Sequence, residues 1–179
     1  MRALLDACVI YPTGMREMLL GVAREGLFEP LWSARILEEW ALAAARLGPG
    51  GEAQARGEIA MAEAAFPRAS VRLQPGQEAR FWLPDPADIH VLAAAVVGHA
   101  DVIVTMNAKD FPQNILGEEG LSRADPDNFL LGFLQAHPAP VEKVANAVLQ
   151  EAQRLSGEPW TMRGLMKKAR LPRLGKALS

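Results

Sequence analysis

A chain of 179 residues, half of them hydrophobic, is long enough to bury a substantial core. Its single cysteine excludes a framework of internal disulfide bonds, and no apolar run approaches the roughly 20 residues of a membrane-spanning helix. The net charge of −2 argues against a chain that binds polyanions through its overall charge. The charge is unevenly distributed, however: residues 160–179 carry six bases and no acid, and residues 1–159 carry 13 bases and 21 acids. This basic tail fits either contact with a nucleic acid or acidic partner, or a solvated terminal helix.

The N-terminal stretch is apolar but short, and it contains Asp6. We therefore expect no signal peptide there, and we expect a cytoplasmic protein. Cys8 also lies in this stretch and is expected to be a small core residue, because buried cysteines are usually unreactive.

The expected strands are short apolar runs. Two of them, residues 2–10 and 102–104, show no alternation of polar and apolar residues, which favours burial on both faces of a parallel sheet. The complete set of expected strands comprises residues 2–10, 27–32, 71–73, 102–104 and 121–124.

The expected helices alternate with these strands. They are residues 15–24, a helix begun by Ser33, residues 52–65, a brief helix at 74–80, a helix begun by Asp88 and ended by Gly98, a helix begun by Asp125-Pro126, and residues 140–155 and 162–170. This alternation predicts a three-layer α/β/α sandwich around a parallel sheet of four to five strands. We expect residues 1–136 to form this domain and residues 137–179 to form a helical extension that ends in the basic tail.

Acidic side chains stand at or near the ends of several expected elements. Asp6 interrupts a buried strand, where a carboxylate is unfavourable unless it is hydrogen-bonded, paired or bound to a metal. Folding could gather it with the other acids, which are Glu39, Asp88 and Asp110, with Asp85 and Asn107 alongside. Such a cluster must take up protons or bind a cation, and oxygen ligands without nearby His or Cys select Mg²⁺ or Mn²⁺. Taken singly, Asp88 also fits a helix cap, and Asn107 and Asp110 fit a turn.

Four stretches carry a family resemblance, and they are, in order, LLDACVIYP, ILEEW, DPADIHVLAAA and VTMNAKDFP. Together they resemble the PIN-domain nucleases, which include VapC-type toxins and PilT N-terminus-like ribonucleases, over roughly residues 2 to 130. The resemblance implies a metal-dependent endoribonuclease that is held silent by an antitoxin, and it implies a homodimer. It assigns Asp6, Glu39 and Asp88 to the acidic core and Asp110 to a fourth, more variable acid. It also makes Asn107 a polar site position and Thr105 a hydrogen-bonding partner near the first aspartate.

The expected function is therefore cleavage of single-stranded or structured RNA with Mg²⁺ or Mn²⁺, as the toxin of a toxin–antitoxin pair. Candidate contacts to the RNA backbone are Arg16, Lys109, Lys167, Lys168 and Arg170, although Arg16 also fits a surface position. We assign no metal role to His90, His99 or His137.

Two other functions are weighed against this one. The first is a PIN scaffold that binds RNA or protein without cutting. The second is a phosphohydrolase with an aspartyl nucleophile, which usually requires a second acid at the position that Cys8 occupies.

Overall fold

The computed structural model describes residues 1–179, which form five strands, ten α-helices and two short 3₁₀ helices. The chain divides into two compact units. The first combines Met1–Tyr11 with Phe28–Ala124, and the second combines Pro12–Leu27 with Asp125–Ser179. These units do not follow the boundary predicted between residues 136 and 137, which stays a prediction.

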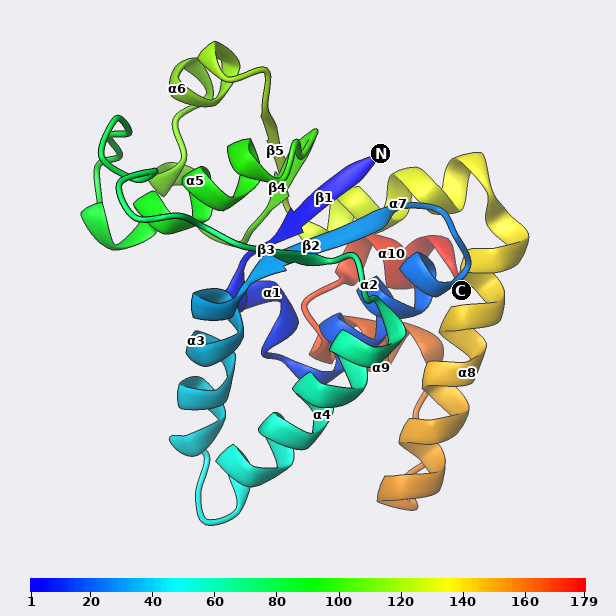
Figure 1. Ribbon diagram of the computed structural model, residues 1–179. Helices are drawn as coiled ribbons and strands as arrows, with labels where there is room; N and C mark the ends of the chain where they lie inside the picture. The colour runs from blue at the N-terminus through cyan, green and yellow to red at the C-terminus, as the bar shows by residue number, and fades with distance from the viewer. The chain divides into compact units, whose positions relative to one another are not determined.

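The first unit is built on one parallel sheet whose strand order is β3-β2-β1-β4-β5 (Figure 1). Its strands are β1 (Arg2–Leu5), β2 (Glu29–Ser33), β3 (Ser70–Val71), β4 (Val102–Val104) and β5 (Ser122–Ala124). In the register of the sheet, Ala3 of the central strand β1 pairs with Pro30 of β2 on one side and with Val102 of β4 on the other. Strands β2 and β3 lie on one side of β1, and β4 and β5 lie on the other. The direction in which successive strands are added therefore reverses between β1 and β4, which is the switch point of the sheet. Ligand sites of open parallel sheets form at the carboxyl ends of the strands at such a point.

The helices of the first unit flank this sheet, which confirms the predicted α/β/α class. They are α1 (Ala7–Ile10), α3 (Ala34–Ala45), α4 (Gly51–Ala65), α5 (Ile89–Val97) and α6 (Gln113–Glu118), with 3₁₀ turns η1 (Pro86–Asp88) and η2 (Ala108–Asp110). Helix α3 begins as predicted at Ser33, whose hydroxyl accepts the N–H of Ile36 at 3.2 Å. Helix α5 contacts β1, β2 and β4, and its residues 91–95 are fully buried.

The predicted first strand, residues 2–10, is wrong beyond Leu5. Asp6 accepts the N–H of Ala7 through its side chain and thereby starts helix α1, so Cys8 lies on a helix. A short apolar run fits a buried strand and a buried helix equally well, and the capping aspartate decides between them. The predicted helix at residues 74–80 is also wrong, because that stretch forms turns.

The second unit is helical. It contains α2 (Thr13–Arg24), α7 (Pro126–Ala136), α8 (Pro138–Ser156), α9 (Met162–Lys168) and α10 (Pro172–Ala177). Helix α2 packs against α7 and α8, and α10 packs against α7 and α9. The buried Asp127 of α7 accepts the backbone N–H groups of Arg173 and Leu174, both at 2.9 Å, and so satisfies the start of α10. None of the helices is both long and apolar enough to cross a lipid bilayer.

The packing of α3 against α4 gives two alanine substitutions of opposite expected effect on one helix. A Cβ atom added at Gly51 would overlap the backbone carbonyl oxygen of Ala44, whereas one added at Gly57 meets nothing within 4 Å. We predict that Gly51→Ala lowers the free energy of unfolding by about 1–3 kcal/mol. Gly57→Ala should raise it by about 0.5–1 kcal/mol, because alanine favours a helix interior. Urea unfolding of both variants measures this, and equal stabilities would contradict the described contact of α3 with α4.

Candidate active site

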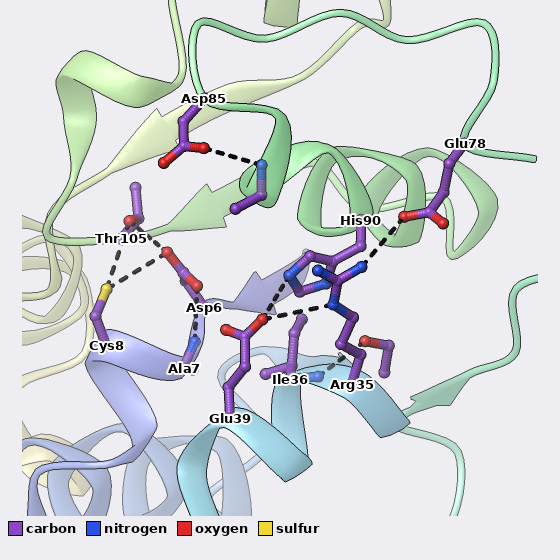
Figure 2. A network of polar contacts seen from close by, with 12 residues as sticks. Asp6, Ala7, Cys8, Arg35, Ile36, Glu39, Glu78, Asp85, His90 and Thr105 are labelled. Carbon is purple, nitrogen blue, oxygen red and sulfur yellow. Dashed lines mark hydrogen bonds and ion pairs between the residues drawn. The ribbon is translucent and has the colours of Figure 1, made fainter. Parts of the chain in front are cut away.

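Asp6 follows β1 directly and is only 5% exposed. Its Oδ2 accepts the hydroxyl of Thr105 at 2.8 Å and the thiol of Cys8 at 3.4 Å, and its Oδ1 accepts the N–H of Ala7 at 2.8 Å (Figure 2). Burial raises the pKa of Asp6, and the charge of Glu39 raises it further, while the three hydrogen bonds oppose the rise. The carboxylate is therefore held in one position, although its environment disfavours its charge.

Thr105 links the ends of the two strands on either side of the switch point. It follows β4, it is 1% exposed, and besides donating to Asp6 it accepts the backbone N–H of Asn107 at 3.0 Å. Cys8 lies beside both groups and accepts the N–H of Met106 at 3.3 Å. Burial, followed by the charge of Asp6, raises the pKa of Cys8 to about 12, so this thiol stays protonated at neutral pH.

Asp88 is the N-cap residue of helix α5, a position that aspartate often occupies, but its side chain makes no capping hydrogen bond there. Asp85 does the capping one turn earlier, because its Oδ1 accepts the N–H of Ala87 at 2.9 Å. Burial raises the pKa of Asp88 to about 6, and the charges of Asp6, Asp85 and Asp110 contribute to the rise. The carboxylate of Asp88 is thus free of a structural role and lies in the field of its acidic neighbours.

Glu39 enters the site from α3. Its Oε1 lies 2.6 Å from Nε2 of His90 and 3.9 Å from Nε of Arg35 (Figure 2). Its neighbour Glu38 is instead exposed and pairs with Arg56 at 2.9 Å. Of these two glutamates, only Glu39 raises the pKa of Asp6 through its charge.

His90 is the residue of this site to which the sequence assigned no role. It is 2% exposed on α5, and despite the short contact with Glu39 neither ring nitrogen makes an aligned hydrogen bond. The available signal was a lone histidine in the otherwise apolar stretch IHVLAAAVV, two residues after Asp88. Its partner on α3 is far away in sequence, so the contact emerges only from the fold.

Asp110 and Asn107 lie in the turn after β4. Asp110 is partly buried, its backbone N–H donates to the carbonyl of Asn107 at 3.0 Å, and its charge acts on Asp88. Lys109, between them, is exposed.

The other predicted RNA contacts belong to the second unit. Arg16 is buried there, and its Nη2 donates to the Thr13 hydroxyl at 3.5 Å, so the alternative of a surface arginine is wrong. Lys167, Lys168 and Arg170 are exposed, and Nζ of Lys168 lies 4.8 Å from the centre of the Trp160 ring.

The donor set of the site suits a hard divalent cation. Its side chains are carboxylates whose charges act on one another, which a cation would relieve. No group of three or more His, Cys, Asp or Glu side chains is arranged to hold a metal ion as it stands. Magnesium needs only one or two carboxylates, because it retains several of its waters. Asp6 and Asp88 fit that smaller requirement.

In comparison with known proteins, a family model described as the PIN domain matches residues 2–109. The chain belongs to the PIN-domain family. A segment of 57 residues is 44% identical to a Mycobacterium tuberculosis protein named "Putative ribonuclease VapC50". The match covers 32% of this chain and spans only about a third, 34%, of that relative's length. No solved structure matches the chain.

The raised pKa of Asp88 predicts how the metal-free PIN domain responds to pH. A carboxyl group whose pKa is higher in the folded than in the unfolded protein destabilises the fold once it ionises. This destabilisation is absent below the usual pKa of 3.8 and complete above about 6. We therefore expect Asp88→Asn to match the wild-type melting temperature near pH 4 and to exceed it at pH 7.5. Thermal melting in chelator across this range tests the prediction, which a difference independent of pH would refute.

Proposed function

We propose that this PIN domain is an endoribonuclease that depends on Mg²⁺ or Mn²⁺ and cleaves single-stranded or structured RNA. The observation that carries the proposal is a set of four acids whose charges act on one another near the carboxyl ends of β1 and β4, with Asp88 making no capping hydrogen bond to its helix. The four acids are Asp6, Glu39, Asp88 and Asp110. Membership of the PIN-domain family supports the proposal, and so does the ribonuclease named in the related protein.

A divalent ion in such a site activates water as a nucleophile near neutral pH and offsets the negative charge that develops on the phosphate. Asp6 and Asp88 would hold the ion, directly or through water, with Glu39 and Asp110 completing its surroundings. The hydrogen bonds from Thr105 and Cys8 keep the Asp6 carboxylate in place. The pKa of Asp88 is raised to about 6, so a substantial fraction of its carboxyl groups is protonated near that pH. Binding of the ion near pH 6 therefore releases a proton from Asp88.

The RNA backbone requires cationic contacts outside the acidic cluster. Lys109 is exposed between Asn107 and Asp110, so it is our first candidate in the sheet-containing unit. The exposed tail residues Lys167, Lys168 and Arg170 are the candidates in the helical unit, where Arg16 is buried and would reach RNA only if its side chain became exposed. Contacts of this kind weaken as salt concentration rises.

The toxin role, an antitoxin partner, a homodimer and a cytoplasmic location are further parts of this proposal. They are supported by the family and by the VapC name of the related protein. A small upstream reading frame that encodes a DNA-binding head and a helical tail would favour the toxin role.

One observation favours the alternative of a PIN scaffold that binds RNA or protein without cutting. No group of three or more His, Cys, Asp or Glu side chains is arranged to hold a metal ion. Binding of Mn²⁺ by the wild-type protein, with the rise in melting temperature that follows from binding to the folded state, would exclude this alternative.

Cleavage of a labelled single-stranded RNA tests the proposal. We expect activity with Mg²⁺ or Mn²⁺ and none with chelator. Asp6→Asn and Glu39→Gln should each lower the activity roughly 100-fold or more, because each removes a carboxylate from the surroundings of the ion that stabilises charge at the reacting centre. Glu38→Gln is the matched control on the same helix, since it breaks only an exposed ion pair with Arg56, which contributes little to stability. Undiminished cleavage by Asp6→Asn would overturn the assignment.

A further inference from the structure

His90 and Arg35 contact the same oxygen of Glu39. Both contacts fall on Oε1, and no hydrogen bond or ion pair involves Oε2. In Figure 2 the dashed lines from His90 and Arg35 converge on this one oxygen, while the other oxygen lies on the side of Asp6. The carboxylate is thus engaged through Oε1, and its other oxygen is left on the side of Asp6.

Of these two contacts, the one with His90 is the stronger constraint. The Arg35 side chain is 58% exposed, lies 3.9 Å from Glu39, and is shared with Glu78 at 4.0 Å, so solvent weakens its attraction. His90 is almost completely buried and lies 2.6 Å from the same oxygen.

The placement of His90 is unfavourable for stability alone. Burial removes the hydration of the imidazole ring, and neither ring nitrogen gains an aligned hydrogen bond that would compensate for it. A leucine of similar volume would fill the same space without that loss. What the imidazole adds at this position is a polar contact to Glu39.

We propose that His90 is a positioning residue that holds Oε1 of Glu39 and so presents Oε2 to the divalent ion. The inference rests on the proposed metal-dependent function. Carboxylates that bind metals are commonly fixed by a hydrogen bond from a neighbouring group, and loss of that group weakens metal binding roughly 10- to 100-fold. Hydrogen bonds at a reaction site are often poorly aligned in the free protein and tighten when its ligands bind, which fits the geometry of His90.

The spacing of Asp88 and His90 gives this arrangement a second consequence. They stand two residues apart at the start of α5, so one short segment supplies both a carboxylate of the cluster and the group that orients a carboxylate from α3. The middle of α3 and the start of α5 are thereby set relative to each other where the ion would bind.

Four proteins compared by Mn²⁺ titration in a calorimeter test the proposal. We expect His90→Leu to weaken Mn²⁺ binding roughly 10- to 100-fold relative to wild type. His90→Gln should stay within a few-fold of wild type, because its amide nitrogen reaches about as far as Nε2. His90→Asn should resemble His90→Leu, because its amide ends near the position of Nδ1. Equal affinity in all four proteins would overturn the proposal.

Thermal melting without metal separates positioning from a merely structural role. We expect His90→Leu to melt at the wild-type temperature or above it, since it removes an unsatisfied buried ring. A lower melting temperature combined with unchanged Mn²⁺ affinity would show that His90 serves packing only. Should His90→Leu fail to fold, the contrast between the Gln and Asn variants decides the question, and equal affinities of those two would refute the proposal.

A double-mutant cycle identifies Glu39 as the group through which His90 acts. In a Glu39→Gln background, His90→Leu should cause no further loss of Mn²⁺ affinity, whereas independent effects would add and refute the proposal. Absence of Mn²⁺ binding by the wild type would overturn the proposed function itself, and this inference with it. Wild-type binding that His90→Leu leaves intact would overturn the inference alone.

Discussion

The carboxylate of Asp6 has lost nearly all its contact with water at the end of the central strand, and three hydrogen bonds compensate for that loss. The donors come from Ala7 and Cys8 on α1 and from Thr105 after β4. One buried charge therefore ends strand β1, starts helix α1, and ties together the two strands at the switch point of the sheet. Because burial still raises its pKa, Asp6 remains a group that a cation would stabilise.

The surrounding residues follow from that buried charge. Burial, followed by the charges of Asp6, Asp85 and Asp110, raises the pKa of Asp88 to about 6. The structural work of the neighbourhood is done elsewhere: Asp85 caps the turn before α5, and Glu38 forms the exposed ion pair with Arg56. The acids of the cluster are left with mutual repulsion, which a proton relieves at low pH and which a divalent ion would relieve at neutral pH. His90 fits this account as the contact that determines which oxygen of Glu39 is free.

Much of the fold could be predicted from local pattern, because buried strands and amphipathic helices leave a periodic trace. Ser33 as the start of helix α3 is an example. The predicted strand was wrong for the four residues after Asp6, because a run of four apolar residues suits either a strand or a helix. The role of His90 could not be predicted, because its 2.6 Å contact joins residues 51 positions apart. The grouping of α2 with the C-terminal helices likewise depends on packing that has no local signature.

The position of a bound ion tests the central claim most directly. A crystal of the wild-type protein soaked in Mn²⁺ and measured at a wavelength with strong manganese anomalous scattering would locate the ion without any assay of activity. The account predicts a peak at the carboxyl ends of β1 and β4, in contact with Asp6 and Asp88 directly or through water, with Oε2 of Glu39 turned toward it. A peak elsewhere, or none beside well-ordered Asp6 and Asp88 side chains at saturating Mn²⁺, would contradict it.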